Sequence, residues 1–517
     1  MSSKGPQDAA VNEGAPLTGS TSNGAYGSAE DGAASNQPTA LKDILRKAPS
    51  DLRGSMQSIR DLIEEHTGKI GYLGSYAIAC NSLTGPAMLH LPATFHRSGL
   101  IPTLFVLIFV CILAALCSLH MANTISKVPG NSNFKEEVEY AEVFRFFWGE
   151  RAYMLAQLLF FLCISCLNIS SIVDTAQTVD TALGNYAGSV ALQISWDPEE
   201  DTLSWIHWVA SECSQEVKIA GDCLPYVDDG EDSSVILTAG YMIVVVIFLP
   251  MALMDLKENA LWQIVGFIVS ILASFQFAIA FIMEGLDFSS QSLWGESWSA
   301  LFGVILFNFA LVIAIPAWLY EKEDSVDAAN VINGSSVLSV VLYILVGALG
   351  SMAMPNVSEN MLESMESGAH GVSLQIGASI FAFFIIGLGI PLFSVLTRYG
   401  LVGSNQFSTK VANMLAVYFP FGVGWMLYEG QGITNLLSWG GVICTSLVAF
   451  ILPLLVALHT VEENEHEGFV SVYGIYLSCF PSLEHDKGAQ IRVLKVLLAL
   501  AVLSIIAAII GNIEGDA

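Results

Sequence analysis

The sequence has little charge, and basic residues are especially few. Charged residues make up 13% of the 517 positions, with 20 Lys and Arg against 48 Asp and Glu, whereas 53% of positions are hydrophobic. So little charge in so long a chain excludes an ordinary soluble protein and predicts a polytopic membrane protein embedded in a lipid bilayer. The acidic excess also argues against a nucleic-acid partner, because an acidic surface repels phosphate.

The sequence also lacks the residue patterns of catalytic chemistry. It shows no pairing of a nucleophile with a base, no metal-ligand spacing and no phosphate-binding loop, so we expect neither an enzyme nor a resident metal or cofactor. It has no rings of charged side chains and no carbonyl filter motif, which disfavours an ion channel.

Long apolar runs are what the chain has instead. Segments of about 17 to 25 mostly apolar residues are long enough to cross a bilayer, and they must be helical because lipid offers the backbone no hydrogen-bond partners. The sequence therefore predicts an all-α membrane protein with eleven transmembrane helices. The predicted spans are 70–97, 100–124, 151–176, 234–254, 260–283, 299–320, 336–355, 372–397, 411–429, 432–458 and 491–511.

The distribution of Lys and Arg fits this register. Nearly all of them fall in loops that eleven spans place in the cytosol, and only Arg97 and Lys218 do not. By the positive-inside rule the N-terminus is then cytosolic. Residues 1–60 are rich in small polar residues and are predicted to be a disordered or amphipathic tail, and 512–517 form a short C-terminal tail. The plasma membrane and a vacuolar or lysosomal membrane fit this topology equally well, and the sequence carries no signal for an oligomeric state.

Two cysteines share the predicted outer loop 177–233. Cys213 and Cys223 lie on the oxidising side of the membrane, whereas six of the other cysteines fall within predicted helices. A disulfide between Cys213 and Cys223 is therefore expected.

The first span is interrupted in its middle by the sequence NSLTGPAMLHLP, residues 81–92. Pro86 removes a backbone donor and crowds the preceding turn, so the helix is expected to part between Ser82 and Gly85. A second half that starts at Pro86 would leave the amides of Ala87, Met88 and Leu89 without intrahelical partners, which favours an anion. The alternative is a simple packing kink, which is common in membrane helices.

Other spans carry polar or helix-breaking residues at matching places. The sixth span contains Asn308 and Pro316, and interruptions in corresponding halves of an inverted repeat indicate a transport site. If spans one to five and six to ten form such repeats, the third span adds Asn168, Ser171 and Asp174. The eighth adds Gly389, Pro391 and Ser394.

Five pieces in the right order resemble the amino acid/auxin permease family, within the larger group of transporters with broken helices and inverted repeats. They are NSLTGPAMLHLPATF, FLPMALMDLKENALWQIVG, LFNFALVIAIPAWLYEK, IPLFSVLTR and FILPLLVAL, and the resemblance covers residues 65–511. It implies a five-plus-five inverted repeat with the first and sixth helices broken and an eleventh helix appended. It also implies secondary active transport of amino acids.

The resemblance places the substrate between the broken parts of the first and sixth helices and the faces of the third and eighth. Unwound carbonyls near Asn81 and Ser82 suit the substrate ammonium, and the helix start at Pro86 suits its carboxylate. Phe307 is a candidate for shaping the side-chain pocket. The predicted substrate-binding residues are Asn81, Ser82, Thr84, Gly85, Ala87, Met88, Asn168, Ser171, Phe307 and Asn308.

The driving ion is the point at which the sequence departs from sodium-coupled relatives. These carry Thr two residues before the proline of the eighth helix, where this chain has Gly389, so a proton is favoured over sodium. Candidate ion-coupling residues are Asn81, Ser394, Asp174 and His90. A sodium-coupled transporter and an amino-acid sensor with little flux are the alternatives. Arg398 is a candidate for an inner gate in which it pairs with Glu321 or Glu323. The alternative is that Arg398 only anchors its helix at the membrane interface.

Overall fold

The structure of the protein is a computed structural model, and it divides the chain into two units at Asp61 and Leu62. It describes residues 69–195, 203–208, 234–289, 291–298, 301–354, 357, 361–366, 371–403, 407–428, 436–463, 472 and 486–515. The first unit, with the predicted tail 1–60, lies outside the described residues. Cys213 and Cys223 also lie outside them, so the predicted disulfide stays a prediction.

Helices dominate the described part of the chain, and eight of them are long and apolar enough to cross a membrane. These are α5 (Leu100–Ser126), α7 (Glu150–Tyr186), α10 (Leu256–Glu284), the broken run Leu301–Glu321, α13 (Ala328–Ala353), the run Val372–Gly403, the run Val442–Glu462 and Lys487–Gly511 within α21 (Lys487–Gly515). The chain is therefore an integral, multi-pass membrane protein.

Three of the predicted spans contain shorter helical segments. The first is divided into α3 (Tyr72–Leu83), the 3-10 helix η2 (Pro86–His90) and α4 (Leu91–Ser98), the fourth contains α9 (Ala239–Ala252), and the ninth contains α17 (Thr409–Asn413), η6 (Met414–Tyr418) and α18 (Phe419–Met426). The total of eleven spans stays a prediction.

The sixth and eighth spans are also divided. The sixth contains α11 (Leu301–Asn308), the 3-10 turn η4 (Leu311–Ile313) and α12 (Ile315–Glu321), and the eighth contains α15 (Val372–Phe381), η5 (Ala382–Ile386) and α16 (Gly387–Gly403). We refer to α3, η2 and α4 together as broken helix 1, and to α11, η4 and α12 as broken helix 6.

Wide π-helical turns recur before prolines in the second half of the chain. The π-helix η6 ends two residues before Pro420, and η8 (Leu447–Ile451) ends two residues before Pro453 at the start of α20 (Leu452–Glu462). Proline donates no backbone hydrogen bond and crowds the carbonyl of the preceding turn, so a locally wider helix accommodates it. Two further π-helices are η5 and η7 (Leu436–Thr445).

The third helix is longer than its apolar pattern suggests. α7 continues to Tyr186, ten residues past the predicted end at 176, so part of the predicted outer loop is helical. It is followed by a three-stranded antiparallel sheet in the order β2-β1-β3, made of β1 (Ser189–Ser195), β2 (Leu203–Trp208) and β3 (Ser234–Thr238). This sheet was not predicted.

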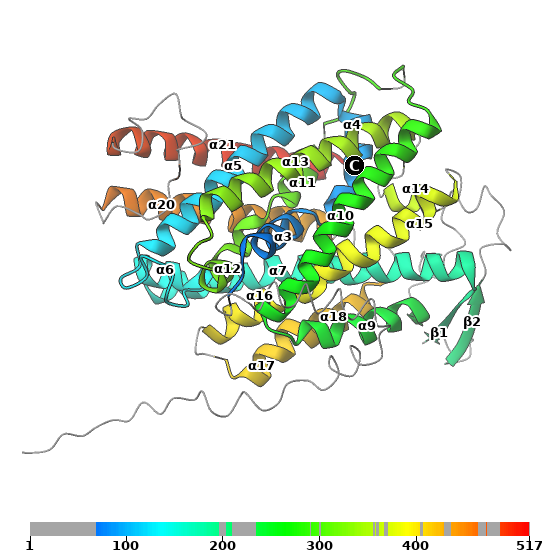
Figure 1. The fold of residues 1–517 in the computed structure, drawn as a ribbon, viewed down its shortest axis with the longest axis horizontal. Coiled ribbons are helices and arrows are strands. Elements are labelled where there is room, and N and C mark those ends of the chain that lie inside the picture. Colours follow the sequence, from blue (N-terminus) through cyan, green and yellow to red (C-terminus); the bar gives the residue numbers. More distant parts are fainter. Residues whose placement is uncertain are drawn as a thin grey trace, which may run out of the picture. The chain divides into compact units, whose positions relative to one another are not determined.

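α10 and α7 each pack against several other helices of the bundle (Figure 1). α10 packs against α3, α13, α15 and α16, while α7 packs against α9, α16, α18 and the short helix α6 (Tyr140–Trp148) that precedes it. Another short helix, α14 (Met361–Glu366), packs on α15. Broken helix 1 is thus surrounded by other helices, which is where interrupted backbone is tolerated at membrane depth.

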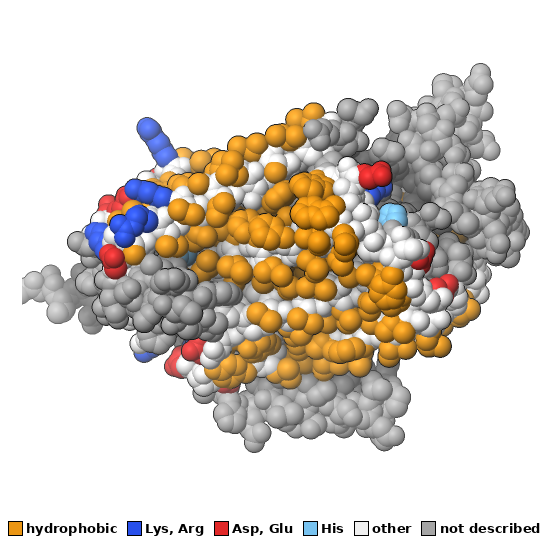
Figure 2. Space-filling model, turned by 90° about the horizontal axis from the view of Figure 1, so that it is seen from above, with side chains coloured by type: hydrophobic (Ala, Val, Ile, Leu, Met, Phe, Trp, Pro, Cys, Tyr) orange, Lys and Arg blue, Asp and Glu red, His pale blue; other side chains and the backbone are white. Residues whose placement is uncertain are grey.

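The outside of the bundle suits a lipid environment. Figure 2 shows apolar side chains spread over one face, with Lys and Arg gathered near one end of it. Large exposed apolar side chains occur on several long helices, among them Phe105, Leu272, Met283 and Leu503. Such a surface is costly in water but favourable in hydrocarbon.

Candidate functional site

Broken helix 1 parts where the sequence predicts, at Thr84 and Gly85. α3 ends at Leu83, whose carbonyl accepts a hydrogen bond from the Tyr343 hydroxyl on α13. η2 then begins with Pro86, and the Met88 amide donates to the Gly85 carbonyl at 3.1 Å. The expectation that the Met88 amide has no intrahelical partner is therefore wrong, because the new segment starts as a tight 3-10 turn, which pairs each amide with a carbonyl only three residues earlier.

The hydroxyl groups of this segment are already engaged. Ser82 Oγ donates to the Ile78 carbonyl at 2.7 Å, and Thr84 Oγ1 donates to the Cys80 carbonyl at 2.9 Å. Both hydroxyl groups thus donate to carbonyls of the last turns of α3. Beside Gly85, by contrast, a Cβ atom would meet no described atom within 4 Å, so there is open space next to the break.

Broken helix 6 parts between Asn308 and Leu311. Pro316 lies in the first turn of α12, so it starts the second half of broken helix 6 rather than ending the helix. The two breaks face each other, since η2 packs against α11 and η4 packs against α3, and η2 also contacts α7. The tertiary structure therefore brings together segments that are more than 200 residues apart in the sequence.

Three asparagines around the breaks each have one unused carbonyl oxygen. Asn81 on α3, Asn168 on α7 and Asn308 on α11 are 6%, 1% and 3% exposed. The Oδ1 atom of each has no hydrogen-bond partner among the described residues. Buried polar atoms are nearly always satisfied by protein, water or ligand. These oxygens are thus available to accept from a bound donor such as an ammonium group.

The amide nitrogens of the same asparagines hold them in place. Asn81 Nδ2 donates to the Gln263 carbonyl and to Gln263 Oε1, both at 2.8 Å. Asn168 Nδ2 donates to Ser394 Oγ at 2.9 Å, and Asn308 Nδ2 donates to the Val304 carbonyl at 3.1 Å. Each side chain is oriented by its donor end, which fixes where its acceptor end points.

Three further predicted substrate residues lie on α7, α11 and η2. Ser171 Oγ donates to the carbonyl of Leu167 in its own helix at 2.9 Å, and it lies 3.7 Å from where a Cβ of Gly389 would be. Phe307 is 8% exposed on α11. The side chain of Ala87 lies outside the described residues.

Two of the predicted ion-coupling residues, Asn81 and Ser394, hydrogen-bond to different side chains. Asn81 pairs with Gln263 and Ser394 pairs with Asn168, so these two belong to different networks. Asp174 Oδ2 accepts from Ser170 Oγ at 2.9 Å in α7. His90 is the last residue of η2 and is partly exposed.

Sequence reasoning missed Gln263 and Asn259 on α10. Gln263 is fully buried and donates to the Leu388 carbonyl and to Asn259 Oδ1, so it links α10 to both α3 and α16. A signal was present, because a Gln within an otherwise apolar span needs a polar partner inside the bundle.

The chain just before α3 and the C-terminal end of α12 are joined through their backbones. The Ile70 amide donates to the Glu321 carbonyl at 2.8 Å, and the Glu323 amide donates to the Ile70 carbonyl at 2.9 Å. Lys69 Nζ also lies 3.6 Å from Asp324 Oδ1. Through these contacts the beginning of α3 and the end of α12 are held side by side.

Arg398 does not pair with Glu321 or Glu323, so the predicted inner gate is wrong as to its partner. Its guanidinium donates to the carbonyls of Leu253 and Met254 and lies 3.1 Å from Asp255 Oδ1. These carbonyls follow the last turn of α9, where a cation is favoured by the helix dipole. Arg398 therefore caps α9 at the corner between α9 and α10.

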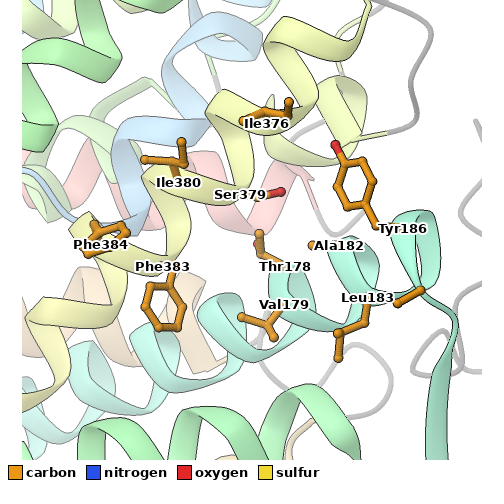
Figure 3. A pocket seen from close by; sticks show the side chains of 11 residues that line it. Thr178, Val179, Ala182, Leu183, Tyr186, Ile376, Ser379, Ile380, Phe383 and Phe384 are labelled. Carbon is orange, nitrogen blue, oxygen red and sulfur yellow. The ribbon is translucent and has the colours of Figure 1, made fainter. Parts of the chain in front are cut away.

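A separate apolar groove of about 360 Å³ lies between the C-terminal part of α7 and the α15–η5 segment (Figure 3). Phe383 and Phe384 come from the π-helix η5, and Tyr186 lies at the end of α7. None of the predicted substrate-binding residues lines this groove.

Residues 68–206 match the sequence profile of a family described as transmembrane amino acid transporter protein. This match confirms the family resemblance over those residues and supports a membrane transporter rather than an enzyme.

Solved structures of two transporters are also similar to the chain. A manganese transporter from Eremococcus coleocola is 12% identical with a TM-score of 0.46, and the match covers 85% of this chain and 94% of the transporter. MHP1, a nucleobase-cation-symport-1 family transporter, is 11% identical with a TM-score of 0.48, and the match covers 85% of this chain and 93% of MHP1. A search among curated proteins gave no match.

Proposed function

We propose, starting from the match of residues 68–206 to the transmembrane amino acid transporter family, that the protein carries amino acids across a membrane by alternating access. The observation that carries this proposal is the set of three buried asparagine oxygens, on Asn81, Asn168 and Asn308, around two facing helix breaks. Broken helices deep in a bilayer are a recurrent setting for substrate sites in transporters.

The proposed substrate position follows from these oxygens and from the space beside Gly85. An ammonium group has three donors and no acceptor, so it suits a set of carbonyl oxygens that have no other partner. Carbonyl oxygens are neutral, so they bind the ammonium of a zwitterion without adding a net charge to the buried site. This chemistry favours a substrate with a free amino group over its hydroxy analogue.

The proposed alternating access uses the joined inner ends of the broken helices. The backbone of Ile70 hydrogen-bonds to Glu321 and to Glu323, the residues before and after Lys322. Because these bonds join the two helices, α3 and α12 are expected to move together when the site opens inward. Helices that are interrupted at the site allow such movement of one half without displacing the other.

A proton is the proposed driving ion. Gly389 provides no hydroxyl on α16, and a Cβ there would already lie 3.3 Å from the Phe393 ring. Asp174 on α7 and His90 on η2 are the proposed proton-carrying groups, because both are titratable and only partly buried. Sodium coupling is the competing hypothesis.

The experiment that tests the proposal is uptake of labelled amino acids into proteoliposomes, under a proton gradient and separately under a sodium gradient. We expect uptake to rise with the proton gradient alone, and we expect a 2-hydroxy acid of matching side chain to compete at least ~10-fold less well, since about 1.4 kcal/mol is a factor of ten. Stimulation by sodium alone would refute proton coupling. Binding without flux would indicate a sensor.

A pair of variants tests the asparagine oxygens. Asn168→Leu removes the acceptor and should raise the KM for uptake at least ~10-fold, because a buried donor of the substrate would lose its partner. Asn413→Leu is the matched control, since Asn413 in α17 also has a buried Oδ1 with no partner among the described residues but lies away from the breaks. Equal effects of the two variants would contradict the proposed site.

A further inference from the structure

Broken helix 1, α10 and α16 meet at one buried side chain, Gln263. Gln263 Oε1 accepts from Asn81 Nδ2 on α3 at 2.8 Å, and Gln263 Nε2 donates to the Leu388 carbonyl on α16 at 2.9 Å. Nε2 also donates to Asn259 Oδ1 one turn earlier in α10, at 3.1 Å. We call Asn81, Asn259, Gln263, Gly266 and Leu388 the Gln263 junction.

Gly266 shows how closely the three helices approach in this junction. It lies three residues after Gln263, hence on the same face of α10. A Cβ at Gly266 would lie 3.1 Å from Leu388 Cδ1, 3.2 Å from Asn81 Nδ2 and 3.4 Å from the Phe384 carbonyl. Any side chain there would press on both α3 and the η5–α16 segment. The hydrogen bonds of Gln263 therefore join helices that are in close contact one turn further along α10.

The junction is built of uncharged groups. Every hydrogen-bond partner given above for Gln263 is an amide or a backbone carbonyl. The charged residues of α10 are Lys257, Glu258 and Glu284 at its two ends, α16 has Arg398 near its inner end, and α3 contributes only the titratable Tyr72, Tyr76 and Cys80. Of the other helices packed on α10, α13 and α15 carry no charged residue, and α12 carries only Glu321 at its end.

The junction also has two unused polar atoms. Asn81 Oδ1 and Asn259 Nδ2 are buried and have no hydrogen-bond partner among the described residues. One is an acceptor and the other a donor, and each belongs to a side chain that is bonded to Gln263. The amides therefore have the means to exchange partners when α3 shifts, rather than leaving a buried group unpaired.

We propose that Gln263 is a positioning residue of the transport cycle, whose neutral amide holds α3 against α16 by accepting from the one and donating to the other. The inference rests on the proposed function in that it assigns the junction to the movement of broken helix 1. It follows that the junction closes without an ion, and that replacing the amide by a carboxyl group makes closure depend on a proton.

The test uses Gln263→Glu, with a readout at Cys80 that does not depend on the substrate. An ionised Glu still accepts from Asn81 on α3 but cannot donate to Leu388 or Asn259, so the link from α3 through residue 263 to α16 is broken at its α16 end. A protonated Glu restores one donor. Cys80 precedes Asn81 and is buried on α3, so its alkylation, followed by peptide mass spectrometry, reports release of α3. We expect the rate of Cys80 alkylation in the variant, divided by the rate in the wild type at the same pH, to be at least ~10 at pH 7.5. This ratio should fall towards 1 as the pH is lowered to 5.5.

Controls separate local release from unfolding. Cys117 on α5 is completely buried and should stay unlabelled in every variant. Gln276→Glu makes the same change elsewhere on α10, where Gln276 donates to the Ser373 carbonyl. In this variant Cys80 should be alkylated at the wild-type rate at every pH. Gln263→Met removes the amide without adding a titratable group, so its raised ratio should not depend on pH.

The proposal is overturned if Gln263→Glu labels at the wild-type rate at every pH, or if Gln263→Met shows the same pH dependence. Uptake is then measured on the same samples, and the variant should regain activity at low pH relative to wild type. Failure of wild-type uptake would refute the proposed transport function, while the Cys80 ratio would still decide whether Gln263 positions α3.

Discussion

Glu139 gives the sharpest prediction about the stability of the end of the bundle at which α6 lies. It immediately precedes α6, outside the membrane-spanning helices, and its side chain is 2% exposed and packed close to Gly403 at the end of α16. Burial, and after it the nearby carboxylates of Glu137, Glu142 and Glu321, raises the pKa of Glu139 to about 8. Near neutral pH the folded protein therefore keeps this carboxyl protonated.

The sign of the pH effect follows from linkage. An unfolded Glu139 titrates near its ordinary pKa of 4.5. Between pH 4.5 and 8 the folded state binds more protons than the unfolded state, so the stability contributed by this group is full below 4.5 and is lost as the pH rises. At pH 7 the loss reaches about 3 kcal/mol, from about two and a half pH units at about 1.4 kcal/mol each.

Glu139→Gln removes this loss while keeping the shape of the protonated side chain. We expect the variant to match the wild type near pH 4.5 and to unfold at a higher temperature at pH 7.5, with the gap widening in between and constant above about pH 8. The assay is thermal unfolding in detergent at several pH values.

The control is Glu136→Gln, because Glu136 is exposed on the same loop and should change little. A gap that does not vary with pH, or a variant less stable than wild type at pH 7.5, would refute the reasoning.

Two further stability predictions concern buried polar contacts. Arg398→Ala should lower the unfolding free energy by about 1–3 kcal/mol, because the carbonyls after α9 lose their donor. Asp255→Asn should lower it less, because that carboxylate is 72% exposed. Equal losses for the two variants in thermal unfolding would contradict the capping role of Arg398. Tyr428→Phe removes the hydroxyl that donates to the buried Asp180 at 2.5 Å, so we expect a loss of about 1–3 kcal/mol. The exposed Tyr418→Phe should have no effect, and an unchanged melting temperature for Tyr428→Phe would show that Ser189 and Gly240 suffice to hold Asp180.

Features that depend on residues adjacent in the sequence could be predicted without the structure. The break after Leu83 follows from Gly85 and Pro86, because proline removes a donor and constrains its own helix turn whatever surrounds it. The long apolar helices follow from composition, since a membrane-spanning run must pair its backbone internally. The three-stranded sheet after α7 was missed, and so was the length of α7, which continues through the polar residues after 176 because tertiary contacts there outweigh the loss of hydropathy.

The sequence by itself determined the class of protein, most of its membrane helices and the position of the first helix break, because these depend on hydropathy and on Gly and Pro. Only the tertiary structure decided which buried polar groups meet. Arg398 binds Asp255, 143 residues away, and Gln263 joins Asn81 to Leu388 across 182 and 125 residues. Such partners are selected by helix packing, since a buried donor must use whichever acceptor the neighbouring helix presents.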